Sequence, residues 1–314
     1  MVTEENKHSY ELIIIGGGPA GLSAGIYAAR GRIDTLLIEK LAMGGQITGA
    51  EKVENYPGFP DGVSGFDLTE LMQRQASLWG LKTHTADVTG LAVDSNTRIV
   101  KTSDGDFLCH AVIVASGSAR SKLGVPGEER LLGRGVSYCA TCDGAFFQDE
   151  AVAVVGGGNA AVSEALALTR YARSVVLVHR RNELRATKVV QERLFSEPKV
   201  HVIWDTVVDE ILGNDKVEKL RLRNAKTGEG SSVNVAGIFV ATGLVPATEF
   251  ATALLDMDQQ GHIITNEVME TKVPGIFAAG DVRHDSAKQC VTAAGDGATA
   301  ALRAERYLTT EVTR

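Results

Sequence analysis

The chain has 314 residues, of which 44% are hydrophobic and 23% are charged, an ordinary composition for a globular protein with room for two domains. A formal net charge of −7 without a basic domain disfavours a nucleic-acid-binding protein. No apolar run approaches the roughly 20 residues that a membrane span needs, and residues 1–8 lack the pattern of a signal peptide. We therefore expect a cytoplasmic protein.

The first recognisable unit is a strand, a tight turn and a helix. An apolar run at 11–15 precedes a Gly-x-Gly-x-x-Gly loop at 16–21, and an alanine-rich segment follows to about Arg30. A second strand at 35–38 ends at Glu39, whose carboxylate can accept hydrogen bonds from ribose hydroxyls. The pattern is typical of a site for FAD or NAD. The alternative is a glycine-rich turn beside an exposed Glu.

Two strand-like segments predict where the chain passes between domains. The segments 111–117 and 237–243 end in small residues, and each precedes an irregular stretch, at 118–126 and 244–249. We interpret these stretches as two crossings, so that a second domain is inserted into the first. The apolar segment at 275–281 would then rejoin the sheet of the first domain.

Cys139 and Cys142 form a Cys-x-x-Cys pair between the first glycine-rich loop and a second one described below. Such a pair either closes into a reducible disulfide or supplies half of a zinc site. The other cysteines, Cys109 and Cys290, are isolated and interpreted as structural, so we favour redox chemistry and predict no metal. Asp143 could protonate the leaving thiolate, although an Asp-Gly pair is equally typical of a turn.

The second glycine-rich loop repeats the plan of the first, roughly 140 residues later. An apolar strand at 151–155 leads into Gly-x-Gly-x-x-Ala at 156–161, and a helix follows to about Tyr171. The next strand lies at 174–178. Two copies of one strand–helix–strand unit predict two nucleotide-binding domains.

The second unit ends in basic residues where the first ends in Glu39. His179, Arg180 and Arg181 follow its second strand, with Arg185 a turn later. An arginine presents a planar fork of donors to phosphate oxygens, which a carboxylate would repel. We therefore predict that this site prefers NADPH, through its 2′-phosphate, over NADH. The alternative is a solvated basic helix start.

These residues resemble the bacterial-type, low-molecular-weight NADPH-dependent thioredoxin reductases, over nearly the whole chain. The resemblance rests on several motifs in the family's order: the loop at 16–21, Gly44-Gly45-Gln46, the stretch 53–59 around Asn55, Cys139 to Gly144, His179 to Ala186, Gly280-Asp281-Val282, and Thr292 to Gly295. It implies two Rossmann-like, three-layer ββα domains, the NADPH domain inserted into the FAD domain. The implied parts are 1–118 and 248–314 for FAD, and 119–247 for NADPH and the cysteine pair.

The resemblance also implies cofactor-binding positions in both domains. Those for FAD are Gly16, Gly17, Gly18, Pro19, Ala20, Gly21, Glu39, Lys40, Gly45, Gln46, Asn55, Val88, Ala115, Gly117, Gly280, Asp281, Lys288, Gln289 and Cys290. Those for NADPH are Gly156, Gly158, Asn159, Ala160, His179, Arg180, Arg181 and Arg185.

The implied activity carries electrons from NADPH through FAD and the disulfide to thioredoxin, in a homodimer. By the same resemblance, Cys142 faces the flavin, Cys139 attacks the partner's disulfide, and Asp143 is the acid. Because nicotinamide and disulfide must both reach one flavin from the same inserted domain, we expect this domain to rotate about the two crossings.

One departure from the family falls at positions that the resemblance places beside the flavin. Ala287 and Lys288 stand where a Tyr-Arg pair is usual, before the retained Gln289. They keep open an alternative donor such as ferredoxin, or another dithiol acceptor. Two further alternatives are the flavoprotein of a peroxide-reducing system, which usually carries an N-terminal thioredoxin-like extension, and a redox sensor without turnover.

Overall fold

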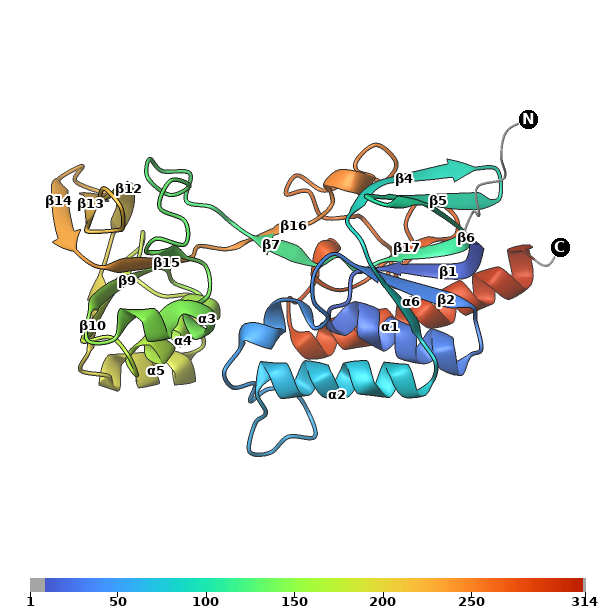
Figure 1. The fold of residues 1–314 in the computed structure, drawn as a ribbon, viewed down its shortest axis with the longest axis horizontal. Coiled ribbons are helices and arrows are strands. Elements are labelled where there is room, and N and C mark those ends of the chain that lie inside the picture. The colour runs from blue at the N-terminus through green and yellow to red at the C-terminus, as the bar shows by residue number, and fades with distance from the viewer. Residues whose placement is uncertain (1–8, 313–314) are drawn as a thin grey trace. The chain divides into compact units, whose positions relative to one another are not determined.

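The computed structural model describes residues 9–312, without the side chains of 311 and 312, and it divides into two compact units (Figure 1). One unit consists of Met1–Ala119 and Val245–Arg314, and Arg120–Leu244 forms the other between these two parts. One unit is therefore inserted into the other.

The first unit is built on a seven-stranded sheet of order β3-β2-β1-β6-β5-β4, with β17 also paired to β6. The parallel strands are β1 (Ser9–Ile15), β2 (Thr35–Glu39), β3 (Lys82–Thr85), β6 (Gly105–Val114) and β17 (Ile276–Ala278). β4 (Val88–Asp94) and β5 (Thr97–Thr102) continue from β6 as an antiparallel meander. Residues 105–109 of β6 pair with β5, residues 108–114 pair with β1, and residues 112–114 pair with β17.

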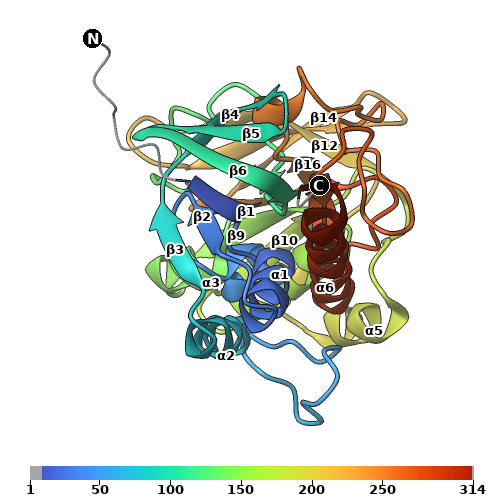
Figure 2. The ribbon, with the colours of Figure 1, turned by 90° about the vertical axis from the view of Figure 1, so that its right-hand side faces the viewer.

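This sheet has a hydrophobic core on each face. Along β1, Leu12 and Ile14 belong to one buried cluster and Ile13 and Ile15 to the other, which explains why the strand is a continuous apolar run. Three helices cover the first face: α1 (Pro19–Arg30), α2 (Gly65–Leu78) and α6 (Cys290–Tyr307) (Figure 2). The meander and the segment around Leu255 cover the second face. The unit therefore has three layers.

The inserted unit repeats this plan. Its parallel sheet has the order β11-β10-β9-β15-β8, formed by β8 (Val136–Ser137), β9 (Ala151–Gly156), β10 (Ser174–Val178), β11 (Val200–Ile203) and β15 (Gly237–Ala241). One core contains residues of its helices, α3 (Ala140–Asp143), α4 (Asn159–Leu168) and α5 (Lys188–Ser196). The other core lies under an antiparallel meander of β12 (Thr206–Leu212), β13 (Lys219–Asn224) and β14 (Gly230–Asn234).

The predicted Rossmann-like units, one inserted into the other, are confirmed, as is the pairing of the 275–281 segment with the first sheet. The crossings differ from the irregular stretches we predicted. β7 (Ser118–Arg120) and β16 (Leu244–Pro246) are short strands that pair with each other. Hydrophobic periodicity cannot reveal a three-residue strand whose partner lies more than a hundred residues away.

Two smaller findings complete the fold. Helix α4 ends at Leu168 instead of about Tyr171, because the chain leaves the helix in a turn. No helix within residues 9–312 is both long and apolar enough to cross a membrane.

Candidate functional site

The glycines of the first loop have different neighbours. Gly16 has a φ of +106°, and a Cβ atom added to it would lie 2.3 Å from the carbonyl oxygen of Ala115. A Cβ atom on Gly21 would lie 1.8 Å from the oxygen of Gly16, whereas one on Gly18 meets nothing closer than the Gly45 Cα atom at 4.0 Å. Packing thus requires the first and third glycines, and the middle one leaves the open space that a pyrophosphate needs.

Glu39 is held against this loop from the end of β2. Its Oε2 accepts a hydrogen bond from the Gly17 N–H at 2.7 Å, and its Oε1 accepts one from the Leu41 N–H at 3.0 Å. A carboxylate oxygen can accept a second hydrogen bond, so Glu39 remains able to receive a ribose hydroxyl. Lys40, in contrast, forms an exposed ion pair with Asp87 at 2.7 Å.

The Gly-Gly-Gln segment lies beside the same loop. The Gly44 N–H donates to the Gly17 carbonyl at 2.8 Å, and a Cβ atom on Gly45 would lie 3.2 Å from the Gly18 Cα atom. Gln46 donates through Nε2 to the carbonyl of Ser118. These contacts bring Gly45 and Gln46 to the edge of the open space over Gly18.

The Gly280-Asp281 turn packs against the start of α1. Gly280 has a φ of +80°, and a Cβ atom on it would lie 2.9 Å from the Ala20 Cβ atom. The Gly280 N–H donates to Asp296 Oδ2 at 3.1 Å, and the same carboxylate accepts two hydrogen bonds from Arg283, at 2.7 and 3.2 Å. Asp296 thereby fixes the turn to α6.

The start of α6 gathers the remaining C-terminal positions. Asn55 Nδ2 donates to Gln289 Oε1 at 3.0 Å, which joins two segments that we predicted to touch the flavin. Burial raises the pKa of the Asp281 carboxyl, and the nearby positive charge of Lys288 opposes this rise. Cys290 is half-buried, and burial raises the pKa of its thiol to about 11.

The other predicted FAD positions lie at the ends of elements in this unit. Pro19 and Ala20 open α1, Val88 opens β4, and Ala115 and Gly117 follow β6. The structure thus brings the loop, Glu39, the 44–46 segment and the Gly280 turn together, and it places Lys40 in a surface ion pair.

The second loop has the same construction as the first. Gly156 has a φ of +154°, and a Cβ atom on it would lie 2.3 Å from the carbonyl oxygen of Ala241, whereas one on Gly158 meets nothing within 4 Å. Asn159 and Ala160, two further predicted positions, begin α4 immediately after this open space. A phosphate could approach the backbone here as well.

The basic residues of this unit divide into one buried side chain and three exposed ones. His179 is 5% exposed, and a Cβ atom on Gly157 would lie 2.2 Å from its ring. Its Nε2 lies 2.9 Å from the carbonyl oxygen of Glu183, and burial lowers its pKa. Three arginines are exposed and form no ion pair with any residue in 9–312: Arg180, Arg181 and Arg185.

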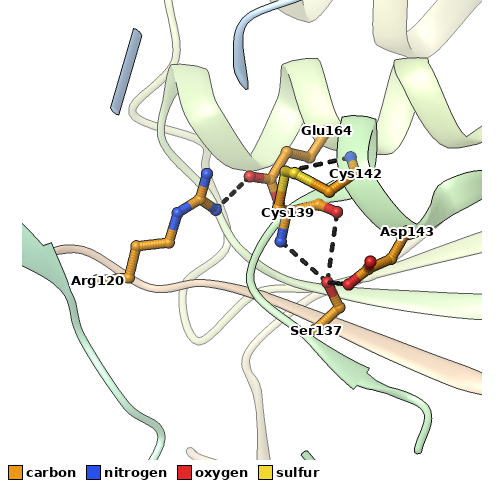
Figure 3. The surroundings of a disulfide bond; sticks show 6 residues. All are labelled: Arg120, Ser137, Cys139, Cys142, Asp143 and Glu164. Atoms are coloured by element: carbon orange, nitrogen blue, oxygen red, sulfur yellow. Dashed lines mark hydrogen bonds and ion pairs between the residues drawn. A yellow bond between two sulfur atoms is a disulfide. The ribbon is translucent and has the colours of Figure 1, made fainter. Parts of the chain in front are cut away.

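Cys139 and Cys142 form the predicted disulfide, with 5.3 Å between their Cα atoms (Figure 3). Cys139 is half-buried and caps the single turn of α3, where its Sγ accepts a hydrogen bond from the Cys142 N–H at 3.2 Å. Cys142 is exposed. Within the described part of the chain, no group of three or more His, Cys, Asp or Glu side chains could hold a metal ion.

Asp143 is hydrogen-bonded to Ser137, the last residue of β8, which lies two residues before Cys139. The hydroxyl of Ser137 donates to Asp143 Oδ2 at 2.6 Å and accepts a hydrogen bond from the Cys139 N–H at 3.0 Å (Figure 3). The disulfide and the carboxyl therefore share one small hydrogen-bond network.

Comparisons with known proteins agree with this geometry. Residues 10–297 match the family described as pyridine nucleotide-disulphide oxidoreductase. A thioredoxin reductase of Listeria innocua is 45% identical over 309 residues, which cover 98% of this chain and 96% of that protein. The crystal structure of Lactococcus lactis thioredoxin reductase is 43% identical, with a TM-score of 0.93 over 96% of this chain and 99% of that one. The T. acidophilum thioredoxin reductase is 30% identical, with a TM-score of 0.92 over 97% and 100%.

The chain belongs to the thioredoxin reductases, within the pyridine nucleotide-disulphide oxidoreductase family. The resemblance seen in the motifs is thereby confirmed. Thioredoxin reductases of this family are flavoproteins that use FAD and a pyridine nucleotide. The open spaces over Gly18 and Gly158, each next to a helix N-terminus, fit the phosphates of two such groups.

One ion pair near the disulfide of this thioredoxin reductase was not predicted. Glu164 on α4 accepts a hydrogen bond through Oε1 from Arg120 Nη1 at 2.5 Å (Figure 3). Only 12% of its side chain is exposed, and no residue in 9–312 binds its Oε2. Burial raises the pKa of Glu164 to about 7, against the effect of Arg120.

The sequence does contain a signal for this buried acid. Glu164 follows Ala161 by three residues and precedes Leu168 by four, and both neighbours are fully buried. Residues at these spacings share one face of a helix. A carboxylate on the apolar face of α4 indicates a specific partner, although it does not tell which one.

Proposed function

We propose that this protein is an NADPH-dependent thioredoxin reductase that uses FAD and the Cys139–Cys142 disulfide. The observation that carries the proposal is the closed disulfide in the same unit as a dinucleotide loop followed by exposed arginines. The relatives described above are themselves named thioredoxin reductases.

The two loops have different roles in this proposal. The first loop, Glu39 and the Gly280-Asp281 turn would hold FAD, and the second loop would hold the pyrophosphate of NADPH. Arg180, Arg181 and Arg185 would bind its 2′-phosphate, and the buried His179 would support the loop from below. When bound, the two cofactors supply an electron pair to the disulfide.

The cysteines then pass this electron pair to thioredoxin. Two electrons and two protons break the Cys139–Cys142 bond and leave two thiols. The Cys139 thiolate attacks one sulfur of the thioredoxin disulfide and forms a mixed disulfide, and the departing sulfur takes a proton. Cys142 attacks this mixed disulfide, which releases thioredoxin as a dithiol and closes the enzyme's disulfide again.

The hydrogen bond from the Cys142 N–H favours Cys139 as the attacking thiol. A donor aimed at Sγ stabilises the thiolate over the thiol, and the thiolate is the nucleophile. Asp143, next to Cys142 in the chain, would be the acid that protonates a thiolate released in these exchanges.

An open cavity of about 320 Å³ beside Asp143 is our proposed contact area for thioredoxin. Its lining includes Phe146, a residue that is 82% exposed, and two basic residues, Arg134 and Lys216. A large exposed aromatic ring with basic neighbours suits a protein partner better than it suits solvent.

We further propose that the inserted unit rotates during turnover, because the disulfide and the second loop lie on one unit and must use one flavin. The two crossings, β7 and β16, are the expected hinge. Spin labels on cysteines introduced at Ser95 and Ser196, one in each unit, should show a distance distribution that changes when NADPH is added. A single unchanged distance in the oxidised and NADPH-reduced protein would contradict rotation.

We also propose a homodimer, located in the cytoplasm. Large apolar side chains on α1 and α2 are exposed, among them Leu78, Tyr27 and Phe66, as expected for a surface that a second copy covers. Light scattering should give the mass of a dimer, and Leu78→Glu should shift it toward the monomer. A monomeric wild type would contradict this part of the proposal.

Anaerobic titration tests the central proposal. NADPH should bleach the flavin absorbance band, NADH should do so much less well, and oxidised thioredoxin should restore the band. Cys139→Ser and Cys142→Ser are the controls, because each should be bleached but not reoxidised by thioredoxin. Failure of NADPH to bleach the flavin would indicate another donor, and bleaching without reoxidation would indicate another acceptor.

A further inference from the structure

Ser137 lies at the centre of the hydrogen bonds around the disulfide. It is the last residue of β8, an edge strand that pairs in parallel with β15. Its side chain is buried, at 4% exposure for the residue. Figure 3 shows its hydroxyl between the backbone of Cys139 and the carboxyl group of Asp143. A buried hydroxyl on a strand is well placed to hold these groups.

The hydroxyl has three polar neighbours, which match its bonding capacity. It accepts from the Cys139 N–H at 3.0 Å, and it can donate to Asp143 Oδ2 at 2.6 Å or to the Cys139 carbonyl at 3.3 Å. A serine has one proton to donate and two lone pairs to accept with. With the proton directed at Asp143, one lone pair remains available.

This arrangement can hold Asp143 in either protonation state. When Asp143 is ionised, or carries its proton on Oδ1, Ser137 donates to Oδ2. When the proton is on Oδ2, Asp143 donates to the free lone pair of Ser137, whose own proton turns to the Cys139 carbonyl. The contact between the two side chains survives in both cases, without movement of the backbone.

We propose that Ser137 is a positioning residue for Asp143: it fixes Oδ2 and leaves Oδ1 to carry the proton that a cysteine thiolate takes. No hydrogen bond within residues 9–312 ends on Oδ1. In the step concerned, the O–H bond of Asp143 breaks, an S–H bond forms, and the carboxylate later takes a proton from water. The inference rests on the proposed function, because it requires that Asp143 is the acid.

A double-mutant cycle on the exchange with thioredoxin tests this role. The enzyme is reduced with NADPH, and the rate of thioredoxin reduction in a single turnover is measured for wild type, Ser137→Ala, Asp143→Asn and the double variant. We expect Asp143→Asn to slow the exchange about 100-fold and Ser137→Ala about 10-fold, through misplacement of the acid. The double variant should match Asp143→Asn within about 2-fold, because Ser137 acts only through Asp143.

Two further variants separate positioning from folding. Ser196→Ala removes a hydroxyl that donates to the Arg193 carbonyl in α5 of the same unit, and it should exchange at the wild-type rate. Ser137→Thr keeps a hydroxyl on β8 and should retain most of the rate, so a rate lost in the alanine and kept in the threonine variant supports the role of the hydroxyl. Thermal unfolding of each variant checks that it is folded.

The failures of the inference and of the proposed function give different results. If the double variant is 10-fold slower than Asp143→Asn alone, Ser137 does not position the acid. The same conclusion follows if the Ser137→Ala variant exchanges at the wild-type rate while the Asp143→Asn variant is slow. If Asp143→Asn exchanges at the wild-type rate, the proposed acid role of Asp143 is wrong and the inference falls with it.

Discussion

The two glycine-rich loops have almost the same backbone environment and different chemistry at the end of the next strand. In each, the first glycine has a positive φ and faces a carbonyl oxygen of the neighbouring sheet region, that of Ala115 or Ala241. In each, the middle glycine, Gly18 or Gly158, faces open space. The shared part of the construction is therefore the part that approaches a phosphate.

The difference lies in the residue that contacts the glycine before the middle one, which is Gly17 in the first loop and Gly157 in the second. Glu39 accepts a hydrogen bond from the Gly17 N–H, whereas the buried ring of His179 packs under Gly157. At the end of β2, the carboxylate of Glu39 can itself reach a ribose. After β10, the buried His179 is followed by the exposed arginines. One strand end thus decides whether the site offers an acceptor for hydroxyls or donors for a phosphate.

The largest expected effect comes from the third position of the two loops. Gly21→Ala places a Cβ atom 1.8 Å from the oxygen of Gly16, so the turn must open, and we expect loss of bound flavin and of stability. The second loop already has Ala161 there, and Ala161→Gly should cost only about 1–2 kcal/mol. The ratio of flavin to protein absorbance and the melting temperature measure both effects. A flavin-replete, stable Gly21→Ala protein would show that the first loop accommodates alanine at this position as the second loop does, and that the third position does not distinguish the two loops.

The next effect concerns the strand end of the second unit. Arg180→Gln together with Arg181→Gln should raise the KM for NADPH by more than about 100-fold, because each of the two lost hydrogen bonds to a charged group contributes about 1.5–3 kcal/mol. The KM for NADH should stay the same, since NADH lacks the 2′-phosphate. Arg173→Gln changes another exposed arginine of this unit and is the control. Equal increases for both nucleotides would mean that the arginines do not recognise the phosphate.

Several features of this molecule are predictable from short stretches of its sequence. The strand-loop-helix units, the closure of the disulfide and the return of β17 to the first sheet follow from local patterns of apolar residues, glycines and cysteines. These features depend on short stretches of chain, and so does the contrast between Glu39 and the basic residues after β10.

Other features depend on contacts between residues that no sequence motif links to each other. Strand β7 exists because β16 lies beside it, and Glu164 is tolerated in a core because Arg120 reaches it from a segment 44 residues away. Ser137 has no recognisable pattern at all, since its role depends on the turn that brings Asp143 back to β8. The burial of His179 is a similar case, because nothing in the stretch after β10 distinguishes it from the exposed arginines that follow.

A third test of the comparison between the two units uses Glu164 on α4. The matching position in the first unit, counted from the first glycine of the loop, is the buried Ala24, so a buried carboxyl group distinguishes the second unit from the first. The pKa of Glu164 is raised in the folded protein from 4.5 to about 7. Its contribution to stability is therefore complete below pH 4.5 and is lost as the pH rises to about 7. Unfolding free energies measured against pH should fall by about 2–3 kcal/mol more for wild type than for Glu164→Gln across this range.

A carboxylate of opposite behaviour serves as the control for this experiment. Glu129 is exposed, and its hydrogen bond from Lys122 lowers its pKa, so Glu129→Gln should change the pH dependence slightly and in the other direction. Parallel stability curves for wild type and Glu164→Gln would mean that Glu164 is already ionised at low pH, and that Arg120 outweighs its burial.

The smallest effect should come from the middle glycine of the second loop, where the fold tolerates a side chain and the ligand does not. A Cβ atom on Gly158 meets no protein atom within 4 Å, so Gly158→Ala should leave the melting temperature unchanged. The added methyl group would occupy the space over the loop backbone, and we expect the KM for NADPH to rise about 10-fold, or about 1.4 kcal/mol. Gly230→Ala on β14 is the matched control, because its Cβ atom also meets nothing, and both its stability and its KM should stay at the wild-type values. An unchanged KM in Gly158→Ala would mean that the nucleotide phosphates do not bind over this loop, and the likeness of the two loops would then be one of fold alone.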